Sequence, residues 1–215
     1  MGARIDPRLI PNRPNFKIEK QLWQEGLRSI AGLDEAGRGA LAGPVYAAAC
    51  IFAPDGKAFR KLKGVRDSKE MSQAAREFWH DKVLANCLAY GIGEASAQEI
   101  DEWGIVPATQ GAMERAIRQL QLKAEHLLID ALVLPENPLP QTKLIKGDQR
   151  SLSIAAASVL AKVARDQAMR DLAEQYPAYG FTQHKGYGTL EHRRQLDQLG
   201  PSKVHRLSFD WKAPN

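Results

Sequence analysis

Short apolar runs separated by glycine- and proline-rich segments dominate the chain. The runs over 28–34 (RSIAGLD) and 45–52 (VYAAACIF) are apolar and partly β-branched, which is typical of strands. The segment 90–96 (YGIGEAS) predicts a third strand, and the compact run 126–130 (HLLID), which ends in an acid, predicts a fourth. The segment 143–146 (KLIK) is also strand-like. The chain is therefore expected to build a sheet from short strands.

Helical spacing of apolar residues appears between these strands. A helix that opens at Ser72 has a stripe of four residues: Trp79, Val83, Cys87 and Tyr90. A second helix, with Pro107 in its first turn, has a buried stripe of four: Met113, Ala116, Ile117 and Leu120. Trp79 and Met113, together with Trp103, are interpreted as core residues and not as part of a functional site.

An alanine-rich helix over 151–176 is apolar or small on all sides in its first half, as expected of a helix packed inside the fold. A short helix over 16–26 precedes the first strand, and residues 1–15 are interpreted as a loose extension. A polar helix over 189–199 precedes the Gly200-Pro201 stop. Three strands followed by helices that alternate with strands indicate an α/β domain with a mixed sheet.

Composition narrows the class of protein. The 215 residues are 44% hydrophobic and 26% charged, which is typical of a globular protein with a substantial core. No apolar run approaches the roughly 18 to 20 residues that span a bilayer, and no secretory layout is found, so we expect a cytoplasmic protein. The net charge of +5 permits a polyanionic partner without requiring one. Cys50 and Cys87 are interpreted as small buried hydrophobes.

The segment AGLDEAGRG, residues 31–39, is the strongest local signal. Asp34 and Glu35 fall where a strand is expected to enter a glycine-rich turn, which can bring both carboxylates toward one site. Two such acids repel each other and favour a cation between them, and their oxygens suit Mg²⁺ or Mn²⁺. A solvated acidic pair is the alternative. Gly37 and Gly39 flank Arg38, so the backbone can approach a ligand there while Arg38 offers a charge.

Two further acids, Asp130 and Asp148, lie at or near predicted element ends. Each has a structural alternative, because Asp130 could cap a turn and Asp148 could be the N-cap of the helix that follows. Four acids at one sheet edge would form a site for two divalent ions, which can activate water for phosphodiester hydrolysis. The five histidines occur in dissimilar contexts and suggest no catalytic triad.

Several segments together resemble the ribonuclease HII family. They are IAGLDEAGRGALAGPV at 30–45, DSK at 67–69, LLID at 127–130, KGDQRSLSIAAASVLAKVARD at 146–166, HKGYGT at 184–189 and HRLSF at 205–209. The order and spacing of these segments are far more specific than any one of them. The resemblance implies a ribonuclease H-like α/β fold, in which a five-stranded mixed sheet is flanked by helices and followed by a small helical C-terminal portion.

The same resemblance implies a division of the chain and a set of site residues. An N-terminal extension and short helix would occupy 1–29, the catalytic domain 30–178, and the helical portion that completes the substrate site 179–215. The metal-binding and catalytic carboxylates would be Asp34, Glu35, Asp130 and Asp148. They would hold one or two Mn²⁺ or Mg²⁺ ions.

Substrate contacts are implied in the same way. Gly37, Arg38 and Gly39 match the family's turn that contacts the 2′-hydroxyl and the neighbouring phosphates, and the 2′-hydroxyl is what separates RNA from DNA. Tyr187 matches the tyrosine that packs against the sugar on the deoxy side of the junction. Four residues are candidate phosphate contacts: Lys69, Ser158, Lys162 and Lys185.

Two details complete the sequence-based interpretation of the site. Arg165 and Asp166 could instead form a structural ion pair on the long helix. Ala131 stands where the family often has glycine, which could shift the end of the strand slightly while leaving the carboxylate of Asp130 in place.

The implied activity is endonucleolytic cleavage of the RNA strand in RNA–DNA hybrids and incision on the 5′ side of ribonucleotides embedded in duplex DNA. Ribonuclease HIII is the nearest rival, but it usually carries an extra N-terminal domain, and only about 29 residues precede the first strand here. A nucleic-acid-binding module without catalysis and a general DNA nuclease are more distant rivals. A monomer is expected, and no terminal motif identifies a sliding-clamp partner.

Overall fold

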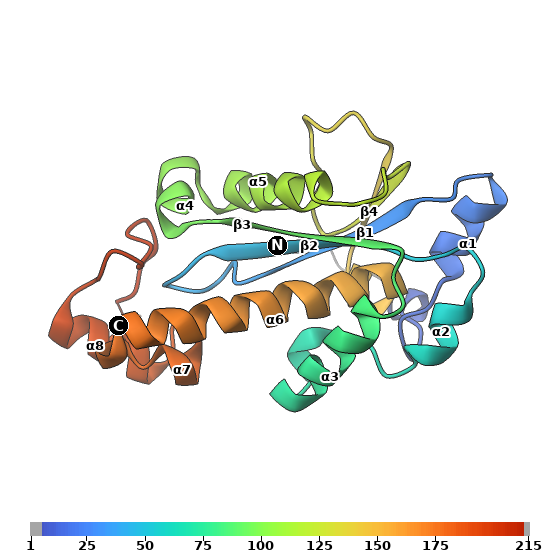
Figure 1. The fold of residues 1–215 in the computed structure, drawn as a ribbon. Coiled ribbons are helices and arrows are strands. Elements are labelled where there is room, and N and C mark those ends of the chain that lie inside the picture. The colour runs from blue at the N-terminus through green and yellow to red at the C-terminus, as the bar shows by residue number, and fades with distance from the viewer. Residues whose placement is uncertain (1–5, 213–215) are drawn as a thin grey trace.

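The computed structural model describes residues 6–212, in which a five-stranded mixed sheet has helices on both faces (Figure 1). The strand order is β3-β2-β1-β4-β5. β1 pairs antiparallel with β2 and parallel with β4, so the sheet is mixed as predicted. The strands are β1 (Ile30–Ala36), β2 (Val45–Ile51), β3 (Ala89–Ala95), β4 (His126–Asp130) and β5 (Gln141–Leu144).

Two helical layers enclose the sheet, and the last two helices lie beyond it near the C-terminal end of α6 (Figure 1). α4 and α5 cover one face, while α6 and α3 cover the other. The helices are α1 (Lys17–Gln24), α2 (Lys57–Lys61), α3 (Gln73–Leu84), α4 (Ala97–Trp103), α5 (Ile105–Arg118), α6 (Leu152–Gln175), α7 (Phe181–His184) and α8 (Leu190–Leu199).

Alternation along the strands divides the core in two. Leu33 and Ile129 face α5 and pack in the cluster that contains Met113. Ile30 and Leu128, which have the other parity, pack in the cluster on the α6 side. Because successive side chains of a strand point to opposite faces, this division also determines which polar residues face α6.

Helix α6 lies unusually close to the central strand β1. A Cβ added to Gly32 would lie 2.3 Å from the backbone carbon of Ser153, so only glycine fits at this contact. Residues 152–161, the first ten of α6, are all buried, in agreement with their small apolar sequence. The start of α6 is therefore held directly over the strand that carries Asp34 and Glu35.

Several sequence-based boundaries were wrong. α3 ends at Leu84, so Cys87 and Tyr90 do not extend its stripe, and Tyr90 belongs to the edge strand β3, where it pairs with Cys50 of β2. Leu120 lies beyond the end of α5. The strand predicted over 143–146 lies two residues earlier, because β5 spans Gln141–Leu144.

The predicted core residues differ in their burial. Cys50 and Met113 are buried, while Trp79 and Cys87 are partly buried and pack against the core. Trp103 was expected in the core, but it is 46% exposed and lies at the end of α4, where its ring packs below the guanidinium of Arg115.

No helix within residues 6–212 is long and apolar enough to cross a membrane. Residues 1–5 of the expected loose extension lie outside the described part of the chain, as do residues 213–215. Residues 7–9 of that extension form a short 3-10 turn, and Asn15 bridges to Ser151.

Glu19 of α1 holds the start of α6, and this contact gives a first prediction. Its side chain is fully buried, and Oε1 accepts hydrogen bonds from the Ser151 hydroxyl at 2.6 Å and the Ser153 N–H at 3.1 Å. Glu19→Ala leaves both donors without a partner and is expected to lower the free energy of unfolding by about 2–3 kcal/mol. Glu19→Gln keeps an acceptor and should lose less.

The measurement is chemical denaturation of both variants beside the exposed control Glu174→Ala. Equal stability of Glu19→Ala and the control would show that this contact does not hold the two helices together.

Candidate active site

Two carboxylates meet at the ends of adjacent parallel strands. Leu33 of β1 is in register with Ile129 of β4, so Asp34 and Asp130 occupy the next positions of the two strands. Both follow the parity of the residues that face α6. Asp34 is 2% exposed. The pairing of β1 with β4 therefore places two acids side by side beneath the start of α6.

Asp148 reaches the same place from the 3-10 turn Gly147–Gln149 just before α6. The Gly147 N–H donates to Asp130 Oδ1 at 2.6 Å, which ties this turn to the end of β4. The structural alternative, in which Asp148 is the N-cap of α6, does not hold, because the Ser151 hydroxyl caps that helix. The carboxylate of Asp148 is thus not used to cap α6 and lies near those of Asp130 and Asp67.

The residue after Asp130 adopts a conformation that glycine favours. Ala131 has φ of 51° while its N–H donates to the Leu144 carbonyl at 2.9 Å. β4 therefore ends in a left-handed turn at the position where the family often has glycine, and alanine reaches the same turn at some conformational cost.

Glu35 lies inside β1, where it pairs with Ala47, and not in the turn after the strand. Its Oε1 accepts a hydrogen bond from Arg38 Nη1 at 3.0 Å. Asp34 Oδ1 accepts from the Glu35 N–H at 2.7 Å. The adjacent acids therefore have different partners, one backbone amide and one guanidinium.

Burial and mutual repulsion oppose the simultaneous ionisation of the four carboxyl groups. Burial raises the pKa of Asp34 well above its ordinary value, and the charges of Glu35, Asp130 and Asp148 raise it further. Burial also raises the pKa of Asp148 to about 7, with Asp67 contributing next. Four carboxylates therefore share a space too small for four uncompensated charges.

Local donors oppose this effect without cancelling it. Burial raises the pKa of Glu35, although the nearby Arg38 works in the opposite direction. Burial also raises the pKa of Asp130 against the hydrogen bond from Gly147. A further source of positive charge is needed for all four groups to be ionised together.

The donor set fits a divalent cation. Asp34 Oδ2 and Glu35 Oε2 are buried and have no hydrogen-bond partner. Carboxylate oxygens are the ligands that Mg²⁺ and Mn²⁺ prefer. Among residues 6–212, no three His, Cys, Asp or Glu side chains are already arranged so that they could hold a metal ion, so the carboxylates would have to turn toward an ion to bind it.

The glycine-rich turn after β1 is fixed by two buried arginines. Gly37 has φ of 96°, and a Cβ there would lie 1.9 Å from Arg165 Nε. Arg206 is fully buried, and its Nη1 donates to the Arg38 carbonyl at 2.9 Å. Gly39 is exposed and has open space around it, as expected where a ligand approaches the backbone.

Tyr187 lies against this turn. Ala40 forms an isolated antiparallel bridge with Tyr187, and the Leu41 N–H donates to the Gly186 carbonyl at 2.8 Å. The half-buried Tyr187 ring faces two cations, with Lys162 Nζ 5.5 Å and Arg165 Cζ 5.1 Å from its centroid. The turn and the tyrosine, about 150 residues apart in sequence, therefore form one surface beside the acids.

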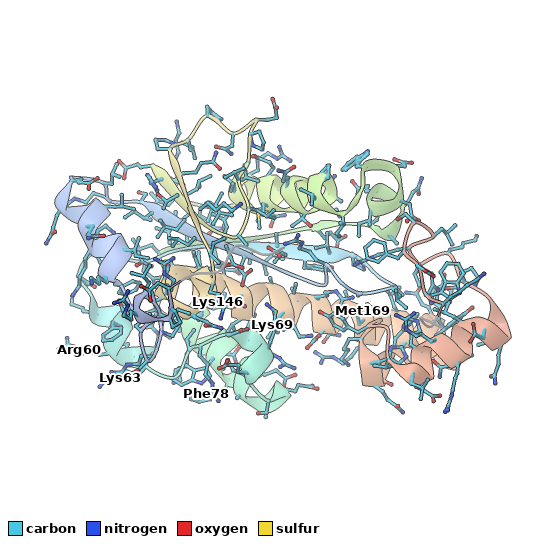
Figure 2. All side chains as sticks on the ribbon, turned by 180° about the vertical axis from the view of Figure 1, so that it is seen from behind. Arg60, Lys63, Lys69, Phe78, Lys146 and Met169 are labelled. Carbon is cyan, nitrogen blue, oxygen red and sulfur yellow. The ribbon has the colours of Figure 1, made fainter. Side chains whose placement is uncertain are left out.

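The lysines predicted to contact phosphate occupy different settings. Burial opposes the charge of Lys69, but nearby carboxylates, Asp34 foremost, raise the pKa of its ammonium. Lys69 and Lys146 lie along the first part of α6, whereas Met169 lies farther along the helix (Figure 2). Lys162 Nζ is 2.5 Å from Asp166 Oδ1, and Lys185 Nζ donates to the Thr182 carbonyl at 2.8 Å.

Ser158 lies inside the protein. It is 2% exposed, and its hydroxyl is 2.9 Å from that of Ser68. Because Ser68 lies next to Lys69, this contact fastens the lysine's segment to α6. The structure therefore gives Ser158 a supporting position behind the site.

Arg165 and Asp166 do not form the ion pair that the sequence suggested. Arg165 instead donates to the carbonyls of Ala42, Pro44 and Lys185. Asp166 pairs with Lys162 and Arg76, two cations on the same side of α6. Adjacent residues on a helix point in different directions, which explains why they contact different partners.

Two supporting residues escaped the sequence interpretation. Asp67 accepts a hydrogen bond from the Lys69 N–H at 2.9 Å and lies close enough to Asp148 to raise the pKa of that carboxyl. The only sequence signal for Asp67 was its position in the DSK segment at 67–69. Arg206 had no signal beyond its place in HRLSF, because its partners are backbone carbonyls distant in sequence.

The chain is similar to known proteins over most of its length. The family model described as Ribonuclease HII matches residues 31–212. A ribonuclease HII from Synechococcus sp. (strain JA-3-3Ab) is 52% identical over 197 residues, covering 92% of this chain and 88% of the relative.

Solved structures agree with the fold. Ribonuclease HII in the PCNA complex from Archaeoglobus fulgidus superposes with a TM-score of 0.72 at 27% identity, covering 87% of this chain and 98% of that one. Bst ribonuclease HIII in complex with Mn²⁺ has a TM-score of 0.63 at 17% identity, covering 85% and 67% of the two chains, and shares the fold alone. The matched family model and the identity over nine-tenths of the chain show that the protein belongs to the ribonuclease HII family.

Proposed function

We propose that the chain hydrolyses the RNA strand of RNA–DNA hybrids and incises duplex DNA on the 5′ side of an embedded ribonucleotide. The observation that carries this proposal is the meeting of the buried acids with the glycine-rich turn and Tyr187 on one surface. The acids supply hydrolytic chemistry, while the turn and the tyrosine supply a means of reading the sugar. Membership in the ribonuclease HII family supports the same activity.

The carboxylates would hold the reaction centre in place. Asp34 and Asp130 are anchored in paired strands, and Asp148 is fixed through the Gly147 contact, so their separation does not depend on mobile loops. A divalent ion held by these carboxylates would supply an activated water and neutralise charge on the scissile phosphate. Arg38 and Lys69 add positive charge at the rim. The products would carry 3′-hydroxyl and 5′-phosphate ends.

Sugar selection would come from the surface beside the acids. Backbone groups of Gly37, Arg38 and Gly39 can exchange hydrogen bonds with a 2′-hydroxyl, which a deoxyribose lacks. The Tyr187 ring can pack against a sugar whose C2′ carries only hydrogen, and a hydroxyl there would be crowded. Their proximity supports reading both sides of a ribose–deoxyribose junction at once.

Replacing Asp34 tests the chemical role of the acids. Asp34→Asn keeps the size of the side chain and removes the charge, so hybrid binding should persist while turnover falls by about a thousandfold or more. The assay compares cleavage and equilibrium binding of a long RNA–DNA hybrid, with the exposed Asp81→Asn as control. Turnover equal to that of the control would remove Asp34 from the catalytic group.

Replacing Tyr187 tests the reading of the junction. Tyr187→Ala should lower kcat/KM about tenfold or more on a duplex with one ribonucleotide and much less on a long hybrid, because aromatic packing on a nucleotide contributes about 1–3 kcal/mol. Tyr187→Phe retains the ring and should remain close to wild type. An unchanged ratio between the two substrates in the alanine variant would contradict this role.

The raised pKa of Asp148 predicts an unusual dependence of stability on pH in metal-free protein. A carboxyl with a pKa of about 7 in the folded state and an ordinary value of 3.8 binds more protons folded than unfolded between these values. Its contribution to stability is therefore complete below 3.8 and is lost as the pH rises to about 7.

Denaturation between about pH 4 and 7 should show this loss as a difference between wild type and Asp148→Asn, because the variant lacks both this titration and the charge that Asp148 adds beside Asp34. Mn²⁺ should restore stability to the wild type at neutral pH. Parallel stability curves for the two proteins without metal would contradict the prediction.

A further inference from the structure

The C-terminal portion contains a buried histidine cluster to which the proposed function gives no role. His184, His192 and His205 are 8%, 0% and 3% exposed. The rings of His184 and His192 are stacked with their centroids 4.2 Å apart, and Phe181 packs edge-on against both. Three imidazoles at such depth require defined hydrogen bonds.

The hydrogen bonds determine which nitrogen carries each proton. The Ser202 backbone N–H can only donate, and it lies 2.9 Å from His205 Nδ1, so this nitrogen accepts, the Ser202 hydroxyl 2.8 Å away can donate to it as well, and the proton of His205 is assigned to Nε2. His205 Nε2 is 3.1 Å from His192 Nε2, which must therefore accept. The proton of His192 is then on Nδ1, which donates to the Tyr187 carbonyl at 3.0 Å.

The resulting chain runs without a gap from Ser202 through two neutral rings to the backbone of Tyr187. Burial lowers the pKa of both His192 and His205 to about 4, so the rings stay neutral and the pattern is intact at neutral pH. His184 adds a parallel support, because its Nδ1 accepts from the Gly186 N–H at 3.2 Å and its Nε2 is 2.7 Å from the Tyr179 carbonyl.

The far end of this chain is joined to the glycine-rich turn. Ala42 forms an antiparallel bridge with His205, and the Gly43 N–H donates to the Val204 carbonyl at 2.8 Å. Arg206, the next residue, donates to the Arg38 carbonyl. The segment that anchors the histidines therefore also holds the turn against which Tyr187 must be placed.

We propose that His192 and His205 are positioning residues that set the Tyr187 ring against the glycine-rich turn and so determine selectivity for the ribose–deoxyribose junction. This inference rests on the proposed role of Tyr187. The histidines act through the Tyr187 backbone and do not touch the substrate, so their loss should alter selectivity more than general turnover.

A matched pair of substitutions at His192 isolates the contact. An Asn side chain places its amide near the position of Nδ1 and can still donate to the Tyr187 carbonyl, whereas a Gln amide lies near Nε2 and cannot. His192→Gln should lower kcat/KM on a single-ribonucleotide duplex about tenfold, the scale of one lost hydrogen bond, with long-hybrid cleavage within about twofold of wild type. His192→Asn should retain most of the selectivity, and His126→Asn, on a strand outside the cluster, is the control.

A double-mutant cycle separates this inference from the proposed function. If His192 acts through Tyr187, adding His192→Gln to Tyr187→Ala causes no further loss of selectivity. Multiplied losses, equal losses in the Asn and Gln variants, or parallel losses on both substrates would overturn the positioning role. Selectivity altered by Tyr187→Ala but not by His192→Gln would defeat this inference alone, and unaltered selectivity in Tyr187→Ala would defeat the role of Tyr187 itself.

The wild-type protein offers an independent check that needs no variant to fold. The ¹⁵N chemical shifts of the two rings at neutral pH should show the proton on Nδ1 of His192 and on Nε2 of His205. The opposite tautomer of His192, or a charged ring at that pH, would contradict the hydrogen-bonded chain.

Discussion

The repulsion among four carboxyl groups at one end of the central strands is the constraint on which the rest of the structure depends. Asp34 and Asp130 are adjacent because β1 and β4 run parallel in register, and Asp148 is added by the turn that leads into α6. Burial raises the pKa of each group, and the charge of neighbouring carboxylates raises it further. A rigid support is needed to hold them there, and the close contact of Gly32 with α6 provides it.

The C-terminal portion is joined to the glycine-rich turn by a different kind of interaction. Arg165 and Arg206 are fully buried, yet their hydrogen bonds go to backbone carbonyls of the 38–44 segment and of Lys185. A guanidinium can satisfy several carbonyls at once in a fixed geometry, which fastens loops that have no regular structure of their own. These bonds hold the glycine-rich turn, which would contact the ribose, and Tyr187, which would pack against the deoxyribose, in fixed positions relative to the sheet.

The sequence predicted the fold class and the central strands because their apolar runs are short and bounded by glycine and proline. It failed at the ends of α3 and α5, where apolar residues such as Tyr90 and Leu120 continue the helical spacing although the chain has already turned. The carboxylates were predictable from their motifs. The partners of Arg165 and the proton positions in His192 and His205 were not, because backbone carbonyls brought together by the fold leave no pattern in the sequence.

The most direct test of the central claim is cleavage of an end-labelled DNA duplex that contains one ribonucleotide, with Mg²⁺, Mn²⁺ or EDTA, beside an all-DNA duplex. If the acids need a divalent ion and the adjoining surface selects a 2′-hydroxyl, as proposed, one cut is expected on the 5′ side of the ribonucleotide. That cut should require the metal, and the all-DNA duplex should stay intact. Cleavage in EDTA, equal cleavage of the all-DNA duplex, or no cleavage with either metal would contradict the account.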